Sequence, residues 1–253
     1  MQRENRPFVL SGGGARGFAH LGVLKAFEEK NIYPQAIAAT SSGSIVAACL
    51  ANGYSTDEVK EIFLKNKIAV SMQWAGWRSG FLSLKKVEQL LKRVLRHLNF
   101  EDLEFPLFIT ATDFITGEQV VFERGPLLPA ILAASSIPIL FRPVEIDGVP
   151  YVDGGLSGNL PAEPLLQSYQ SIVGVHVNPL APYNVKNGFL PNVERILHLA
   201  IRENVLKNRH RCALFIEPAE LAVYGVFDFK KFDAIYTAGL IYTREYLRQY
   251  AGL

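Results

Sequence analysis

The chain has few cysteines, almost no excess charge and no long apolar run, and each of these absences excludes a class of protein. Only two of its 253 residues are cysteines, Cys49 and Cys212, which is too few for a disulfide framework and suits a reducing compartment. The formal net charge is +2, so a protein that binds nucleic acid over a broad surface is not expected. With 49% hydrophobic residues, the chain can bury a full core and is not a disordered protein.

Membrane-spanning and secreted proteins are also disfavoured. The longest apolar candidate, residues 127–141, is interrupted by prolines and serines, whereas a membrane-spanning helix needs roughly 18 or more apolar residues. Residues 1–6 are polar and lead into an apolar run without the charged start and small-residue cleavage site of a secretory leader. We therefore expect a cytoplasmic protein.

Short apolar runs alternate with helical patterns along the whole chain. The patterns predict strands at residues 8–10, 36–40, 107–113, 119–123, 144–146, 151–152, 172–177 and 214–216. They predict helices at residues 21–30, 44–51, 56–66, 84–98, 126–134, 193–212 and 229–250, with Ser55 and Glu58 as a capping box and Ser83 as an N-cap. Strands separated by helices indicate a largely parallel sheet covered on both faces. A single α/β domain over residues 1–253 is the simplest interpretation.

The first predicted strand is followed by a glycine-rich turn, GGGARG at residues 12–17, which precedes a helix. Gly12, Gly14 and Gly17 have the spacing of the dinucleotide fingerprint, but no acidic residue ends the next strand, where that fingerprint needs one to bind ribose. Successive glycines can instead direct their backbone N–H groups to one point and stabilise negative charge there, as an anion nest or an oxyanion hole. A tight turn without a ligand is the remaining alternative.

The second strand-to-helix turn, ATSSG at residues 39–43, is similar to the nucleophile elbow G-x-S-x-G. In that motif a strained turn raises a serine hydroxyl above the sheet, and small residues let strand and helix approach closely. Gly43 fits the pattern, whereas Ala39 replaces the first glycine and adds a Cβ. A serine at such a turn is more often a helix N-cap, but Ser42 and Ser44 are better placed for that role, which leaves Ser41 for chemistry.

An elbow serine needs a base, and the residues alone leave two choices open. Three of the histidines after the elbow lie in predicted helices, and His176 lies in an apolar strand. Asp153 ends a strand and precedes Gly154 and Gly155, so a substrate could approach its carboxylate closely. The alternative for Asp153 is a local hydrogen-bond acceptor in a tight turn.

Taken together and in order, these motifs resemble the patatin-like phospholipase family in its bacterial, single-domain form. The resemblance extends over nearly the whole chain and rests on the glycine block at 12–17, the elbow around Ser41, the ASSIP run at 134–138, the DGG run at 153–155 and the NLP run at 159–161. It implies a three-layer α/β/α sandwich with a mainly parallel central sheet. It also implies a serine esterase or lipase that hydrolyses the acyl esters of phospholipids, lysophospholipids or acylglycerols.

The resemblance also implies roles for single residues. Ser41 is the expected nucleophile and Asp153 the expected base of a dyad without histidine. The backbone N–H groups of Gly13 and Gly14, beside Gly12, are expected to form the oxyanion hole, with Arg16 supporting that loop. Because Ala39 departs from the elbow pattern, a silent or slow module that binds an anion or a partner protein stays as the alternative.

Two further features bear on the lipid. Both tryptophans, Trp74 and Trp77, lie in residues 72–84 and form either an interfacial lid or part of the core. Arginines recur every seven residues at 195, 202 and 209, as either a solvated helix face or a stripe that attracts anionic headgroups. The expected partners are a lipid ester and the surface of a membrane, and not a nucleic acid. The sequence contains no H-E-x-x-H or paired C-x-x-C motif, so we expect neither a metal nor another cofactor.

Overall fold

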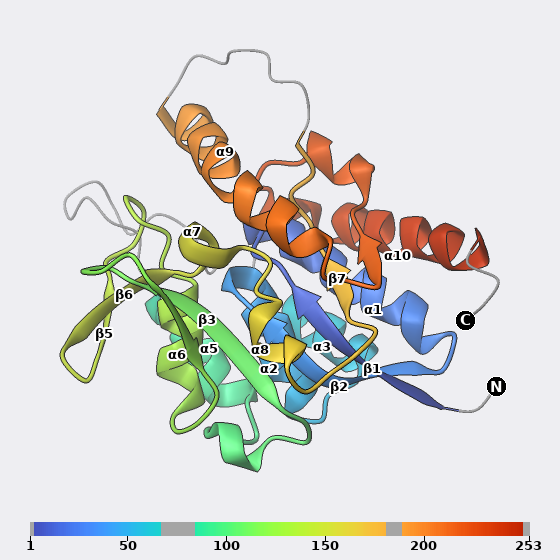
Figure 1. Cartoon of the computed structure of the whole chain (residues 1–253), viewed down its shortest axis with the longest axis horizontal. Coiled ribbons are helices and arrows are strands. Elements are labelled where there is room, and N and C mark those ends of the chain that lie inside the picture. The colour runs from blue at the N-terminus through green and yellow to red at the C-terminus, as the bar shows by residue number, and fades with distance from the viewer. Residues whose placement is uncertain (1–2, 67–83, 181–188, 250–253) are drawn as a thin grey trace.

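The computed structural model describes residues 3–66, 84–180 and 189–249 (Figure 1). The strands are β1 (Glu4–Leu10), β2 (Ile32–Ala39), β3 (Leu107–Asp113), β4 (Gln119–Phe122), β5 (Val144–Ile146), β6 (Val149–Asp153), β7 (Val173–Val175) and β8 (Leu214–Ile216). The helices are α1 (Phe18–Glu28), α2 (Ser41–Ala51), α3 (Thr56–Lys65), α5 (Lys85–Val94), α6 (Leu127–Ala134), α7 (Gly155–Gly158), α8 (Glu163–Leu166), α9 (Phe189–Arg209) and α10 (Phe232–Gln249). Short 3-10 turns cover Gly14–Gly17, Phe100–Asp102, Ala219–Val223 and Phe229–Lys231.

The described strands form one sheet in the order β5-β6-β3-β2-β1-β7-β8, with β4 paired to β3 outside this path. The pairs β3–β2, β2–β1, β1–β7 and β7–β8 are parallel. The strands β4, β5 and β6 pair in the antiparallel direction beyond β3. The centre of the sheet is therefore parallel, and its antiparallel edge brings the end of β6 back to the carboxyl ends of β2 and β3.

The parallel strands are buried on both faces. Along β1, Phe8 and Leu10 belong to the larger apolar cluster, whereas Val9 belongs to a second cluster on the opposite face. The larger cluster contains side chains of α1, α2, α3, α5, α6 and α10, and the second contains side chains around α8 and α9. Figure 1 shows these helices on the two sides of the sheet. The predicted three-layer α/β/α arrangement with a mainly parallel centre is confirmed.

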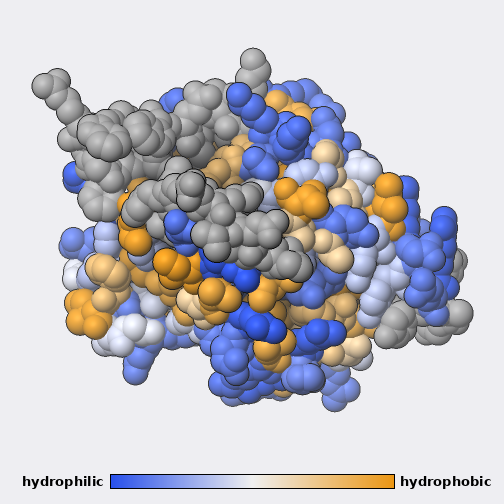
Figure 2. Space-filling view, turned by 90° about the horizontal axis from the view of Figure 1, so that it is seen from above, coloured by the Kyte–Doolittle hydropathy of each residue, from blue (hydrophilic) through white to orange (hydrophobic). Residues whose placement is uncertain are grey.

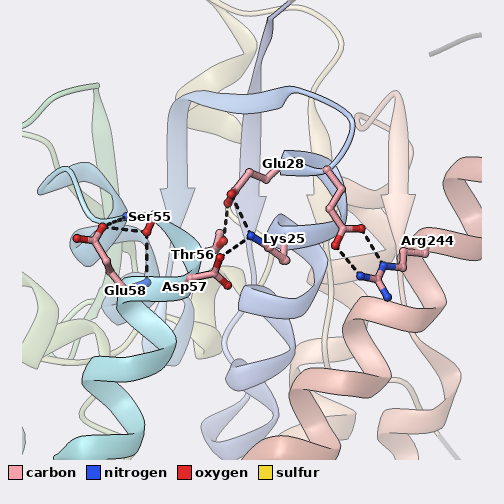
Figure 3. Close-up of polar contacts among 8 residues, drawn as sticks. Lys25, Glu28, Ser55, Thr56, Asp57, Glu58 and Arg244 are labelled. Atoms are coloured by element: carbon pink, nitrogen blue, oxygen red, sulfur yellow. Dashed lines mark hydrogen bonds and ion pairs between the residues drawn. The ribbon is translucent and has the colours of Figure 1, made fainter. Parts of the chain in front are cut away.

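Polar contacts connect the helices on one face of this sheet (Figure 3). On α1, Lys25 pairs with Glu28 at 3.1 Å and with Asp57 of α3 at 2.6 Å. Arg244 of α10 donates two hydrogen bonds, of 2.8 and 2.6 Å, to the Glu29 carboxylate after α1. These contacts are solvent-exposed or half-buried, so each contributes little stability, but together they connect α3 and α10 to α1.

Most of the predicted elements are confirmed to within a few residues. The capping box of Ser55 and Glu58 opens α3, and the Asp147–Gly148 turn between β5 and β6 has positive φ angles of 50° and 80°. Such angles are those of a tight two-residue hairpin turn, in which Asp and Gly are favoured. The final helix begins at Phe232 rather than residue 229, after a 3-10 turn.

The predicted end of one helix, α5, and the predicted N-cap of another, α2, are wrong, because tertiary contacts override the local sequence pattern. The helix predicted to run to residue 98 ends at Val94, where the Tyr54 hydroxyl donates to the Val94 carbonyl at 2.6 Å and Leu95 turns into the core. Leu84 occupies the N-cap of α5, and Ser83 lies outside the described residues. Neither Ser42 nor Ser44 caps α2, because its N-cap is Thr40, whose hydroxyl donates to the Thr110 carbonyl of β3.

Two further findings concern the membrane. Across residues 3–66, 84–180 and 189–249, no helix combines the length and the apolar character that crossing a bilayer requires. The tryptophans Trp74 and Trp77 lie outside the described residues, so the choice between a lid and a core segment stays a prediction.

Candidate active site

The three motifs picked out from the sequence meet at the carboxyl ends of the central strands. The glycine turn follows β1, the elbow follows β2, and Asp153 ends β6. Ala39 of β2 pairs with Ile109 of β3, and Ala111, two residues further along β3, pairs with Asp153. Ser41 and Asp153 therefore stand at the same level of the sheet. The carboxyl ends of strands are the usual place for a ligand site in an open α/β sheet.

Ser41 has the strained backbone conformation that the sequence analysis expected of an elbow serine. Its φ angle is 49°, in the left-handed region that residues with a Cβ rarely adopt, and it is the first residue of α2. The turn is tight, since a Cβ on Gly43 would lie only 2.6 Å from the carbonyl oxygen of Ser11 and 2.8 Å from that of Leu10. The Ser44 hydroxyl donates to the Ser41 carbonyl at 2.6 Å and helps to hold this conformation.

Ala39, the departure from the elbow pattern, fits without disturbing the turn. Its side chain is fully buried in the larger apolar cluster, and its backbone pairs in register with Leu10 and Ile109. The Cβ therefore adds to the core at a position where the strand is still regular. The strained backbone angle is found instead at Ser41, two residues later.

Asp153 is a buried carboxylate with an unusually high proton affinity. Burial raises the pKa of its carboxyl from 3.8 to about 6, against the opposing effects of the Ser41 hydroxyl and the Gly155 N–H. The Gly155 N–H donates to Oδ1 at 2.8 Å. Oδ2 is buried and has no hydrogen-bond partner of normal geometry among the described residues. The Ser41 hydroxyl therefore lies near enough to the carboxylate to favour its ionised form, although it makes no hydrogen bond of normal geometry to Oδ2.

The glycine turn presents backbone to the same place. Gly14 has a φ of 55°, and a Cβ there would lie 2.3 Å from the Val226 carbonyl oxygen. A Cβ on Gly12 would lie 2.9 Å from the Ser41 Cβ, so the turn and the elbow are in direct contact. Within the described part of the chain, the N–H groups of Gly13 and Gly14 donate to no backbone carbonyl, which leaves them for a ligand.

A hydrogen-bonded network supports the glycine turn from behind. The Asn178 amide donates to the Gly12 carbonyl at 2.6 Å. The Arg16 guanidinium donates to the Tyr224 carbonyl at 2.6 Å and to the Asn178 Oδ1 at 3.4 Å. Because the carbonyl and N–H of one peptide point in opposite directions, holding the Gly12 carbonyl orients the Gly13 N–H. Asn178 had no signal in the sequence analysis, since it follows a short strand without any motif.

One histidine lies at the site. His198 of α9 has its Nε2 3.3 Å from an Arg16 nitrogen, and burial, with the charge of Arg16, lowers its pKa to about 3. A histidine that weak in proton affinity is a poor base. His176 binds Glu217 at 2.7 Å, and His20 lies close to the Ser11 carbonyl with its pKa lowered by burial to about 4. None of these three is placed beside Ser41 as a triad base.

The site opens as a cleft of about 70 Å³. Backbone and side chains of the three motifs line it together with residues that the sequence analysis did not select. The lining residues are Gly12, Gly13, Gly14, Ser41, Ile137, Pro138, Asp153, Gly155, Leu156, Asn159, Asn178, His198, Ile201 and Val226. Arg16, Ala39, Ser42, Gly43 and Gly154, which the sequence analysis also selected, do not line the cleft.

Comparison with known proteins gives a consistent family. A family model described as patatin-like phospholipase matches residues 8–166, which is more than half of the chain. An uncharacterized NTE family protein of Mycobacterium tuberculosis is 29% identical over 270 residues, which cover 95% of this chain and 46% of that protein. The lysophospholipase NTE1 of Saccharomyces cerevisiae is 26% identical over 273 residues, which cover 95% of this chain and 16% of that protein. The chain thus spans less than half the length of these relatives.

A solved structure shares the fold. The crystal structure of VipD from Legionella pneumophila superposes with a TM-score of 0.59 at 15% identity, covering 97% of this chain and 67% of VipD. At that identity the similarity concerns the fold alone.

Proposed function

The chain belongs to the patatin-like phospholipase family, and from that premise we propose that it hydrolyses acyl ester bonds of lipids through Ser41 and Asp153. The observation that carries the proposal is the strained Ser41, with φ 49°, next to a buried carboxylate whose pKa is about 6. Backbone strain and a perturbed carboxyl in one cleft are typical of catalytic groups. Ala39, which had favoured a silent module, is accommodated in the core.

In the proposed acylation step, the Ser41 Oγ attacks the ester carbonyl carbon while Asp153 accepts the serine proton on Oδ2. Near neutral pH a carboxyl with a pKa of about 6 is mostly ionised, yet it is a stronger base than an ordinary aspartate. The Gly13 and Gly14 N–H groups donate to the carbonyl oxygen as it becomes negative, and each such donor is typically worth ~3 kcal/mol in the transition state. The protonated Asp153 then returns its proton to the leaving alcohol.

In the proposed deacylation step, a water molecule gives a proton to Asp153 and its oxygen attacks the acyl carbon. The bond from the acyl carbon to Oγ breaks, and the proton passes to Ser41, which restores the enzyme. The carboxylate alternates between base and acid, so no histidine is required. The half-buried His198 is neutral near neutral pH, contacts Arg16 and lines the cleft.

The substrate class follows from the family and the size of the cleft. A cleft of about 70 Å³ is well below the ~300 Å³ of a typical pocket for a drug-sized ligand. It fits the reacting ester group rather than a whole lipid, so the acyl chain or headgroup must extend across neighbouring surface. The name of the yeast relative supports including lysophospholipids among the substrates to be tested.

The same proposal includes contact with a lipid surface beside the cleft. On α9, Ile196 and Leu199 flank His198 and are 65% and 51% exposed, and Ile139, just after the lining residue Pro138, is 57% exposed. Seen from above, the molecule shows apolar patches among polar side chains (Figure 2). A double variant Ile196→Asp, Leu199→Asp should bind phosphatidylcholine vesicles less in flotation assays and keep its activity on soluble short-chain esters.

A fluorophosphonate probe tests the central proposal. The probe should label the wild-type protein at Ser41, identified by mass spectrometry of the labelled peptide, and should not label Ser41→Ala. A panel of phosphatidylcholine, lysophosphatidylcholine, monoacylglycerol and p-nitrophenyl esters then defines the preferred substrate. A wild-type protein that neither reacts with the probe nor hydrolyses any of these esters would refute the proposal.

A further inference from the structure

Asn159 lies against the proposed dyad. It follows α7 directly after the turn that carries Asp153, it lines the cleft, and only 2% of its surface is exposed. Two glycines make room for its amide, since a Cβ on Gly12 would lie 2.7 Å from its Oδ1 and a Cβ on Gly155 would lie 3.0 Å from the same oxygen. A side chain at either of these two positions would come too close to the Asn159 amide, so the two glycines leave the space that this amide occupies.

The position of the two glycines also indicates how the Asn159 amide is oriented. Its Oδ1 faces the Cα atoms of the two glycines, where Cα–H groups are weak donors that suit an oxygen. The Nδ2 then points elsewhere, and it is buried without a hydrogen-bond partner among the described residues. Buried polar nitrogens are nearly always hydrogen-bonded in proteins, so this one needs an explanation.

The complementary atom lies in the same wall. The Asp153 Oδ2 is also buried and also lacks a hydrogen bond of normal geometry among the described residues. The two residues converge on Gly155, where a Cβ would lie 3.0 Å from the Oδ1 atoms of both Asn159 and Asp153. Because both unsatisfied atoms are shielded from solvent, bulk water cannot satisfy either of them. A partner must come from the protein or from the reacting groups.

We propose that Asn159 is a positioning residue for Asp153: when the carboxylate is ionised, the Asn159 amide donates a hydrogen bond to it and holds Oδ2 toward Ser41. An aspartate oxygen has two lone pairs, so Oδ2 can accept from the amide and still accept the serine proton. The Gly155 N–H fixes Oδ1, and the amide fixes the second oxygen. This inference rests on the proposed function, and it deepens it by assigning the control of the base to a residue outside the dyad.

In the proposed arrangement the Asn159 amide adds one more donor to a carboxylate that has few polar neighbours. Only the Ser41 hydroxyl and the Gly155 N–H act on the Asp153 carboxylate besides burial, and no charged side chain of the described residues does so. His198, the titratable side chain across the cleft, is neutral above pH 3 or so, because burial and Arg16 lower its pKa to about 3. A donor that favours the ionised carboxylate therefore has a large relative effect.

The test compares pH profiles of kcat/KM on a soluble ester for wild type, Asn159→Asp and Asn159→Ala. Asn159→Asp keeps the size of the side chain and replaces the donor by a second carboxyl, which raises the pKa of one member of such a pair strongly. We expect its acid limb to move up by two pH units or more and that of Asn159→Ala by about one. At pH values below the wild-type limb, kcat/KM of Asn159→Ala should be about tenfold lower than that of wild type at the same pH. At pH 9 the kcat/KM values of both variants should approach the wild-type value.

A second readout does not depend on activity. In a Ser41→Ala background, the carboxyl ¹³C signal of Asp153 can be titrated by NMR with and without Asn159→Ala, and the midpoint should rise by about one pH unit. Asn52→Ala is the matched control, because Asn52 is a buried amide at the far end of α2 that bonds Ala48 and His97. Asn52→Ala should leave the acid limb of the kcat/KM profile and the titration midpoint of Asp153 unchanged.

The outcomes separate the two proposals. A rate that falls equally at all pH values in well-folded Asn159 variants, or an unchanged Asp153 midpoint, would overturn the positioning role and leave the dyad standing. A wild-type protein without Ser41 labelling refutes the hydrolase, while the NMR titration still decides whether Asn159 controls Asp153.

Discussion

Ser41 and Asp153 stand side by side across β3, although one follows a parallel strand and the other ends an antiparallel strand. The register Ala39–Ile109 on one side of β3 and Ala111–Asp153 on the other sets both residues at one level. The Thr40 hydroxyl and the Gly154 backbone both approach the Thr110 carbonyl, which joins the two turns through β3. The mixed sheet thus places the carboxylate that we propose as the base beside the serine, with no loop histidine in that position among the described residues.

The first prediction concerns the serine itself. Ser41→Ala should abolish hydrolysis of short-chain esters and fluorophosphonate labelling, because no other hydroxyl of the described residues stands on a strained turn next to Asp153. The fold should persist, since the change removes a single hydroxyl oxygen at the first residue of α2 and leaves the Cβ and the backbone in place. Activity and circular dichroism measured on the same preparation check both parts. More than a few per cent residual turnover would point to another nucleophile, with the buried Ser135 examined first.

The second prediction is a pH profile. Asp153 must be ionised to accept the serine proton, and burial raises its pKa to about 6. The value of kcat/KM should therefore fall tenfold per pH unit below about pH 6 and level off above it. A histidine base would give the same direction, so the profile must be repeated with His198→Gln. An unchanged acid limb in that variant is expected, because the pKa of His198 lies near 3.

Much of this site could be predicted from the sequence, because its parts lie on short local patterns. The glycine turn and the elbow serine each follow a recognisable parallel strand, and such strands end at one edge of the sheet. Asp153 is marked by the DGG run at the end of its own strand. Local sequence pattern predicted the capping box of α3 correctly, because Ser55 and Glu58 lie within one helical turn of each other. These features depend on neighbours in the chain.

The missed features depend on contacts between distant segments. Asn178 reaches the Gly12 carbonyl from beyond β7, and His198 reaches Arg16 from α9, with no motif to mark either residue. The end of α5 at Val94 is likewise set by Tyr54, forty residues earlier in the chain. No pattern within a window of the sequence carries this information.

The third prediction addresses Ala39. Because its side chain is packed in the larger apolar cluster and its backbone is regular strand, Ala39→Gly should remove a methyl group from the core. We expect a loss of stability of about 1 kcal/mol and no gain in turnover. Denaturant unfolding and kcat on a soluble ester measure the two effects. A several-fold faster Gly variant would mean that the missing elbow glycine does slow catalysis.

The fourth prediction concerns Asn178, which supports the proposed oxyanion hole. Asn178→Ala removes the donor to the Gly12 carbonyl and frees the peptide that carries the Gly13 N–H. Turnover should fall about 10²-fold, close to the loss of one oxyanion donor, while KM changes much less. Asn208→Ala is a useful control, because this buried amide donates to the Leu160 carbonyl outside the cleft. Equal losses in the two variants would show general destabilisation instead.

The last prediction joins activity and stability at Asp153. Asp153→Asn keeps the shape of the side chain but cannot accept the serine proton, so acylation should slow by about 10²–10⁴-fold. The same change should make the protein more stable at pH 8. The pKa of Asp153 is raised by burial from 3.8 to about 6, so the folded protein holds this proton more tightly than the unfolded chain. Stability is then lost as the pH rises from about 4 to about 6.

At 1.36 kcal/mol per pKa unit, the ionised carboxylate costs the wild-type fold ~3 kcal/mol above pH 6, and an uncharged amide avoids this cost. Urea unfolding at pH 8 should show the Asn variant more stable by about 1–3 kcal/mol, with the difference shrinking toward zero at pH 4. Asp113→Asn is the control, because Asp113 is partly exposed, accepts two backbone N–H bonds in its own turn and should gain nothing at pH 8. An Asp153→Asn variant that is inactive but less stable than wild type at pH 8 would mean that the carboxylate holds its turn together. An active one would exclude Asp153 as the base.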